Sequence, residues 1–272
     1  MIQSLYTGAS GLTGQQKNID VIANNVSNLN TDGFVRSRFD FQDCLYLRMR
    51  APKPASNGPE KNLMRGSGAI AYQTALILQQ GPLRETGRVL DFALEGRGFF
   101  AVENPLLDEE YEGNADRSIL LVRGGNFHLS VEEESAYLVD EMGRYILNEN
   151  SQRIELPAGV PVEGIVCSAE GQLSYTPPLG GETVEIARLM LLDFVNPAGL
   201  ERVGHGAFVQ SDNSGDIINA DAAVLQRMLE SSNVDYSEEV TRLIRAQRAY
   251  QIASRVVTTA DQMMGIANNI RQ

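Results

Sequence analysis

Two glycines in the middle of the chain have the spacing of a nucleotide-binding loop. The run Gly96-Arg97-Gly98-Phe99-Phe100-Ala101 fits the letters of the dinucleotide-binding motif. In that motif a helix must begin directly after the glycines, because the pyrophosphate binds to the free backbone amides of its first turn. The residues that follow here, Phe99 to Glu103, have the pattern of a strand. We therefore expect no nucleotide cofactor at this loop.

The other residues that could do chemistry are few and scattered. His128 and His205 are the only histidines, and neither has a second ligand at metal-binding spacing on a shared element. Cys44 and Cys167 are too few and too far apart for a zinc site, and we interpret them as ordinary thiols, leaving their pairing open. The sequence has no Gly-x-Ser-x-Gly elbow and no Walker loop. We expect no catalytic residue, no metal and no cofactor, although a β-rich hydrolase would show little in its sequence.

The charge of the chain is concentrated in its middle. The net charge is -12, yet residues 1–50 and 235–272 each carry five basic and four acidic side chains. Nucleic-acid binders need clustered Lys and Arg, so the composition disfavours a nucleic-acid partner. The near-neutral ends can associate while the acidic centre stays hydrated. The apolar runs are too short to span a bilayer and no cleaved leader is visible, so we expect no membrane insertion.

The last forty residues have the most regular apolar period in the chain, which predicts a long helix. Asp235 followed by Glu238 has the spacing of a capping box, which predicts that the helix starts near Tyr236. Seven-residue repeats predict a coiled-coil seam. A second apolar row, which includes Ala249, Val256 and Met263, widens the face beyond what one helical partner covers. The seam residues are Leu243, Ala246, Tyr250, Ala253, Val257, Ala260, Met264 and Ala267.

The first thirty residues show a second helical pattern, and we expect this helix to pair with the C-terminal helix. Its two seam rows are Leu5, Leu12, Ile19 and Val26, and Ile2, Ala9, Gln16 and Ala23. Gly8, Gly11 and Gly14 lie inside it, and each costs about 1 kcal/mol relative to alanine in a helix interior. The pattern fits either a buried helix of a globular domain or a segment that orders only when copies pack together. The polar run from Asn24 to Gly33 predicts a stop and turn, with Gly33 left-handed and Phe34 re-entering an apolar environment.

Between these ends the sequence changes character. Residues 51–59 hold three prolines and a glycine, which predicts a linker or exposed loop. From about Gly68 to Val224, short apolar segments alternate with glycine-rich turn signals, which predicts an all-β centre. The fold class is therefore α+β, a mainly-β central domain flanked by terminal helices that pair as a coiled-coil-like stem. The predicted domains are a stem of 1–35 and 230–272, an extended region of 36–80 and a β-rich domain of 81–229.

The ends resemble a known family. The runs Gly11-Leu12-Thr13-Gly14-Gln15-Gln16-Lys17-Asn18-Ile19-Asp20-Val21-Ile22-Ala23-Asn24-Asn25-Val26-Ser27-Asn28, Gln247-Arg248-Ala249-Tyr250 and Ala260-Asp261-Gln262-Met263 are similar to the termini of bacterial flagellar axial proteins. The likeness is strongest to basal-body rod proteins of the FlgG and FlgF type. Gln15-Gln16 and Asp43-Cys44-Leu45-Tyr46 favour the FlgG type. Two stretches, 103–116 and 221–227, depart from the family pattern, which leaves the paralogue open.

The resemblance implies a structural, non-enzymatic role in assembly. Rod proteins pair their terminal helices with those of neighbours into a hollow axial tube, which serves as drive shaft and as conduit for later subunits. The implied partners are copies of the chain, other rod and hook proteins, and the flagellar type III export apparatus, and the implied location is the basal body. The alternatives are an FlgF-type proximal rod protein, a hook protein, or a monomeric β-rich binding or carbohydrate-processing domain. The expected subunit-interface residues are Leu5, Leu12, Ile19, Asn24, Asn25, Val26, Asn28, Gly33, Phe34, Leu243, Ala246, Gln247, Tyr250, Ala253, Val257, Ala260 and Met264.

Overall fold

The computed structural model describes residues 2–48, 64–104, 119–132, 135–156, 161–175 and 183–270. The predicted linker at 51–59 and most of the acidic stretch at 103–116 lie outside these residues. The chain divides into two compact units. Unit 1 comprises Met1–Ser27, Ser37–Ala75 and Asp235–Gln272, and unit 2 comprises Asn28–Arg36 and Leu76–Val234. The predicted α+β class is confirmed.

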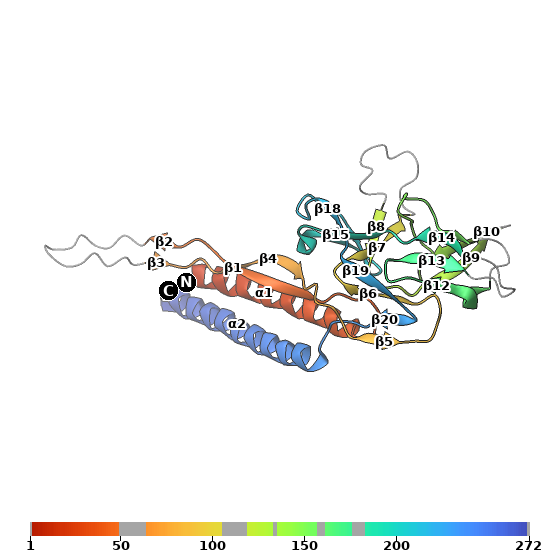
Figure 1. Cartoon of the computed structure of the whole chain (residues 1–272). Coiled ribbons are helices and arrows are strands. Elements are labelled where there is room, and N and C mark those ends of the chain that lie inside the picture. The colour runs from red at the N-terminus through yellow and green to blue at the C-terminus, as the bar shows by residue number, and fades with distance from the viewer. Residues whose placement is uncertain are drawn as a thin grey trace. The chain divides into compact units, whose positions relative to one another are not determined.

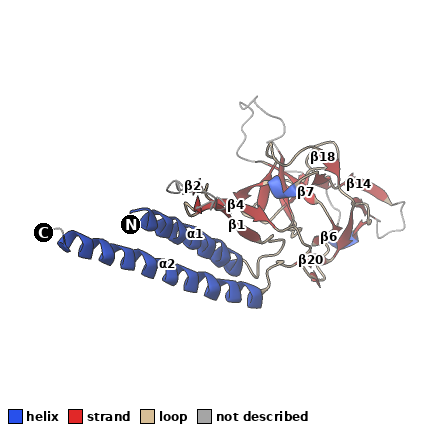
Figure 2. Cartoon of the chain, turned by 90° about the vertical axis from the view of Figure 1, so that its left-hand side faces the viewer, coloured by secondary structure: helices blue, strands red, loops and turns tan. Residues whose placement is uncertain are grey.

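Unit 1 is built on two long helices, α1 (Ile2–Ser27) and α2 (Tyr236–Ile270). They lie side by side and antiparallel, with both chain ends at the same end of the pair (Figures 1 and 2). The ribbon of β1 (Ser37–Asp43) and β4 (Ala69–Leu76) completes the unit, together with the short pair β2 (Leu47–Arg48) and β3 (Met64–Arg65). Residues 37–75 are thus grouped with the helices, whereas the sequence predicted a separate extended region at 36–80.

Unit 2 contains a six-stranded antiparallel sheet in the order β16-β17-β8-β7-β15-β18. Two three-stranded sheets, β11-β10-β9 and β12-β13-β14, and two ribbons, β19-β6 and β20-β5, surround its core. The strands are β5 (Leu83–Glu85), β6 (Phe92–Gly96), β7 (Phe99–Glu103), β8 (Ile119–Val122), β9 (His128–Glu132), β10 (Ser135–Val139), β11 (Glu155–Leu156), β12 (Ile165–Cys167), β13 (Gln172–Tyr175), β14 (Val184–Arg188), β15 (Leu191–Phe194), β16 (Glu201–Gly204), β17 (Ala207–Val209), β18 (Ile217–Asn219), β19 (Ala222–Gln226) and β20 (Met228–Glu230), with 3-10 turns at Val162–Gly164 and Pro197–Gly199.

Strand β7 explains why the large sheet has two apolar faces. Successive side chains of a strand point to opposite sides, so Phe99 and Phe100 enter different clusters. The ring of Phe100 packs on Phe127 with centroids 5.1 Å apart, and the ring of Phe99 packs on Phe208 at 5.6 Å. Both faces of the sheet are therefore covered by core.

Two segments of the β-rich region do not form continuous strands. Residues 185–194 are interrupted at Leu189 and Met190, giving β14 and β15. Residues 145–148 make only isolated bridges, such as Val102 with Ile146, because they return between two sheets and not along one partner. Strand β7 does follow Gly98, as predicted, so no helix opens after these glycines.

Candidate interface between subunits

The start of α2 is set by Asp235. Its carboxylate Oδ1 accepts a hydrogen bond from the backbone N–H of Glu238 at 3.1 Å, which satisfies one of the free amides of the first turn. The predicted N-cap is confirmed, and the helix begins at Tyr236.

Asn25, on α1, connects this helix to β1 and to α2. Its Nδ2 donates to the carbonyl of Ser37 at 2.8 Å and to Glu239 Oε2 at 3.2 Å, and its Oδ1 accepts from the N–H of Ser37 at 3.0 Å. The amide thus satisfies both backbone groups of the first residue of β1 and one oxygen of a fully buried carboxylate on α2. Arg242 pairs with the other oxygen of Glu239 at 3.2 Å.

The contact face of α2 follows the predicted seam. Ala246 and Ala260 are buried, and four further predicted seam residues are half-buried, namely Leu243, Ala253, Val257 and Met264. Gln247 is exposed and Tyr250 is 37% exposed, so these two lie at the margin of the face. Ala267, at the end of the predicted seam, is exposed.

The contact face of α1 differs from the predicted one. Leu5, Leu12, Ile19 and Val26 are half-buried, but Ala9, Gln16 and Ala23 are exposed. Gly8 is buried and packs closely on α2, since an added Cβ would lie 2.7 Å from Cγ2 of Val257. The contact face of α1 includes Gly8 and Ile22, which are buried. The glycine at position 8 leaves room for Val257, whereas the methyl group of an alanine there would clash with it. The predicted second seam row of α1 is therefore wrong.

The polar turn after α1 has roles inside the chain. Gly33 is left-handed, with φ 69°, and its N–H donates to the carbonyl of Glu230 at 2.7 Å. Phe34 is buried in unit 2, with the Arg202 guanidinium 4.7 Å from its ring centroid. The left-handed glycine and the apolar surroundings of Phe34 are confirmed. As contacts to another subunit, Asn25, Gly33 and Phe34 stay predictions, and so do the exposed Asn24 and half-buried Asn28.

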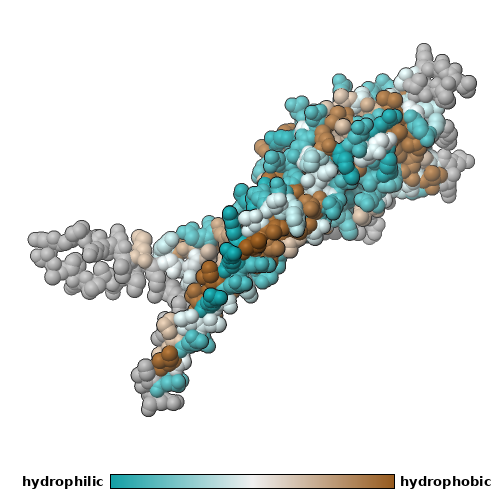
Figure 3. Space-filling view, turned by 90° about the horizontal axis from the view of Figure 1, so that it is seen from below, coloured by the Kyte–Doolittle hydropathy of each residue, from teal (hydrophilic) through white to brown (hydrophobic). Residues whose placement is uncertain are grey.

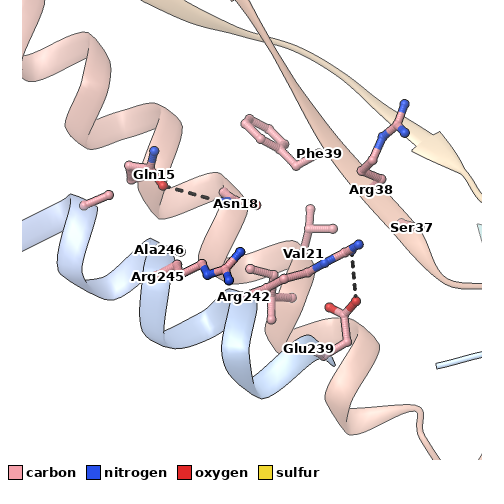
Figure 4. A pocket seen from close by; sticks show the side chains of 12 residues that line it. Gln15, Asn18, Val21, Ser37, Arg38, Phe39, Glu239, Arg242, Arg245 and Ala246 are labelled. Atoms are coloured by element: carbon pink, nitrogen blue, oxygen red, sulfur yellow. Dashed lines mark hydrogen bonds and ion pairs between the residues drawn. The ribbon is translucent and has the colours of Figure 1, made fainter. Parts of the chain in front are cut away.

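A cavity of about 360 Å³ lies between α1, α2 and β1 (Figure 4). Three arginines line it, Arg38, Arg242 and Arg245, together with the buried Glu239. Arg38 pairs with Asp40 at 2.8 Å, and Arg242 pairs with Glu238 and Glu239. In the part of the chain that the structure describes, Arg245 has no ion pair. The cavity therefore has a surplus cation at its edge.

Apolar side chains remain uncovered on α2. Ile252, Val256, Met263 and Ile266 are 63%, 48%, 50% and 60% exposed. We call these four residues the outer stripe. Figure 3, which views the molecule from below, shows apolar patches among the polar surface. The outer stripe belongs to the second apolar row that the sequence predicted to exceed the needs of one partner.

Metal and membrane features give no competing site. Among the described residues no group of three or more His, Cys, Asp or Glu could hold a metal ion. None of the described helices combines the length and hydropathy needed to cross a bilayer. Both thiols are free, and burial raises the pKa of Cys167 to about 12.

Two protein-family models match the terminal regions of the chain that form α1 and α2. A family model described as flagella basal body rod protein matches residues 5–34, and one described as flagellar basal body rod FlgEFG protein C-terminal matches residues 225–270. The flagellar basal-body rod protein FlgG of Borreliella burgdorferi is 34% identical over 281 residues, covering 100% of both chains. The chain belongs to the FlgG family of flagellar basal-body rod proteins. FlgG of Caulobacter vibrioides is 32% identical over 99% of this chain, and the hook-basal body complex protein FlhP of Bacillus subtilis is 29% identical over its full length.

Membership of the FlgG family confirms the predicted resemblance and makes the chain a structural rod subunit of the flagellar basal body. The two family-model matches contain nearly all of α1 and the whole of α2. Sequence reasoning missed Glu239 and Gly8. A signal was present for Glu239, because it lies seven residues before Ala246 in the seam row, where a charge is unusual.

Proposed function

We propose that unit 1 joins copies of this chain side by side, through its terminal helices, into the axial drive shaft and export conduit of the rod. The observation that carries the proposal is the outer stripe, Ile252, Val256, Met263 and Ile266, which α1 leaves uncovered. Large apolar side chains repeated on one side of a long helix favour a protein partner.

Burial of this surface favours association. Fully burying one such side chain contributes about 1.5–3 kcal/mol, so four half-exposed residues contribute several kcal/mol for each contact. In an open polymer each subunit makes this contact with the next, so the same contact repeats along the fibre. The near-neutral charge of both chain ends removes the repulsion that the acidic centre would create.

The proposed partners are copies of the chain and the rod and hook proteins that continue the axis, with the flagellar type III export apparatus as the route of delivery. The proposal assigns assembly and no catalysis. The predicted interface residues on the margins of the helix pair, Leu5, Leu12, Ile19 and Tyr250, are part of the surface that neighbours would cover.

The proposal is tested by placing a charge in the outer stripe. Val256→Asp should abolish motility and stop basal-body assembly, because a carboxylate would be buried without a partner. Its matched control is Gln262→Asp, which adds the same charge on an exposed polar position of α2 and should leave motility near wild type. Circular dichroism should show the same helix content in both purified variants. Normal rods in the Val256→Asp strain would overturn the proposal.

Hydrogen exchange gives a second test that needs no variant. Amides of residues 1–30 and 240–272 should exchange markedly faster in dilute monomer than in polymer, since neighbours in the polymer cover the helices. Equal, strong protection of these amides in monomer and polymer would contradict the proposal.

A further inference from the structure

Two opposite charges on α2 have no partner inside the described part of the chain. Arg245 and Asp261 are both exposed, and neither makes an ion pair or a hydrogen bond there. On the same helix Arg242 pairs with Glu238 and Glu239, whereas Arg248 and Arg255, like Arg245, make no ion pair with the described residues. Asp261 is the one acid of α2 that is left unpaired there. Exposed single charges are common, so their geometry decides what they could do.

The two charges lie on opposite sides of the same helix. Sixteen residues separate Arg245 from Asp261. At 3.6 residues per turn and 1.5 Å per residue, their side chains point about 160° apart and lie about 24 Å apart along the axis. When two complementary charges lie on opposite sides of one molecule, each copy can bind the next in a head-to-tail series. The same arrangement does not give a closed twofold dimer.

Gly265, one helical turn after Asp261, provides a second, independent observation. A Cβ added at Gly265 would meet no atom within 4 Å, so no contact among the described residues requires a small residue there. Glycine inside a helix reduces helix stability relative to alanine. Gly265 follows Asp261 by four residues, and Ala249 follows Arg245 by four, so one shift of sixteen residues aligns both pairs. Two small residues facing each other let the backbones of two parallel helices come close.

We propose that a second copy docks with its α2 parallel to the first and shifted by about 24 Å, so that Arg245 of one copy binds Asp261 of the next and Ala249 faces Gly265. The inference rests on the proposed function, because it specifies which surfaces of unit 1 meet. The surplus cation at the cavity in Figure 4 is thereby neutralised by the neighbour. The contact is heterologous, as an open fibre requires.

Other exposed acids in unit 1 fit less well. Asp20 accepts a hydrogen bond from Gln16 Nε2 at 3.0 Å and lies on α1. Asp43 is the last residue of β1. Neither combines a position opposite Arg245 on α2 with a small residue one turn further on.

Charge exchange tests the pairing. Arg245→Asp and Asp261→Arg should each reduce the motile fraction of cells at least tenfold, because each places like charges together in the neighbour contact. The double variant should restore at least half of wild-type motility. Arg248→Asp is the matched control, and Asp261→Arg should not improve it. Failure of the double variant to recover, or recovery of Arg245→Asp by Asp20→Arg, would overturn the inference.

Disulfide trapping tests the register. In a Cys44→Ser, Cys167→Ser background, Ala249→Cys with Gly265→Cys should give a ladder of covalent oligomers on a non-reducing gel of isolated basal bodies. Ala249→Cys with Ala267→Cys should give none, because two residues along a helix turn the side chain by about 160°, to the opposite side of α2 from Gly265. If no ladder forms while Val256→Asp still blocks assembly, the register is wrong and the proposed function stands. If Val256→Asp also assembles normally, the proposed function itself fails.

Discussion

The side-chain amide nitrogen of Asn25 lies 3.2 Å from a carboxylate oxygen of Glu239, although 214 residues separate them in the chain. The same amide also bonds both backbone groups of Ser37. One side chain therefore fixes the relative positions of α1, α2 and β1.

Asn25→Ala should lower the free energy of unfolding of unit 1 by about 1–3 kcal/mol, because a buried carboxylate and a strand end lose their partner. Urea unfolding followed by far-UV circular dichroism measures the loss. Asn268→Ala, an exposed amide on α2, should change the same quantity by less than about 0.5 kcal/mol. Equal effects of the two substitutions would contradict this role for Asn25.

Gly8→Leu should destabilise the helix pair by about 1–3 kcal/mol, since its side chain would overlap Val257. Val257→Ala should recover part of the loss in the double variant. Gly11 offers the matched control, because an added Cβ there meets nothing within 4 Å. Gly11→Ala should raise stability by up to about 1 kcal/mol. Destabilisation by Gly11→Ala of the same size as by Gly8→Leu would argue against the close crossing.

Arg123→Ala should destabilise unit 2 by about 3–5 kcal/mol. The guanidinium bonds the buried Glu230 at 2.5 Å and the carbonyls of Gly98 and Gly96 at 2.6 and 2.8 Å, and these three contacts would be lost together. Arg153→Ala removes an exposed pair with Glu103 and should cost at most about 1 kcal/mol. Thermal unfolding of both variants measures the two losses of stability. Similar melting temperatures would contradict the larger contribution of the buried Arg123–Glu230 pair.

Cys167 should resist alkylation in the folded protein. Burial raises its thiol pKa to about 12, so at pH 8 roughly one molecule in ten thousand carries the thiolate, against about a quarter for an unperturbed thiol. The rate should rise about tenfold per pH unit up to that pKa, and unfolding in urea should remove the protection. Because the folded state holds the proton more tightly, stability should fall above about pH 8.5. Mass spectrometry of iodoacetamide-treated protein measures the rate, and fast labelling of Cys167 at pH 8 would refute it.

Local sequence signals predicted the start of α2 well. Contacts between residues far apart in the chain were not predicted, because they depend on the facing element and not on the local pattern. Asp235 caps the very next turn, so its spacing from Glu238 was informative. On α1 the seven-residue repeat placed Ala9 in the seam, but Ala9 is exposed, and Gly8, one residue earlier, is buried against Val257.

The short strands β18 and β20 have only three residues each and no alternation of apolar and polar residues, so their sequences give little signal for a strand. Ile217 and Ile218 are both exposed, and the strand exists only because it pairs with β15. The outer stripe was visible as a second apolar row, since a repeat in sequence is enough to place residues on one side of a helix. Which copy covers that side is a property of the assembly, and no local pattern encodes it.

The first helix of the chain is closed by the last. The β-rich region lies between α1 and α2 in the chain, so a ribosome makes that whole region before it makes the helix that pairs with α1. Until then a nascent chain carries α1 without its helical partner.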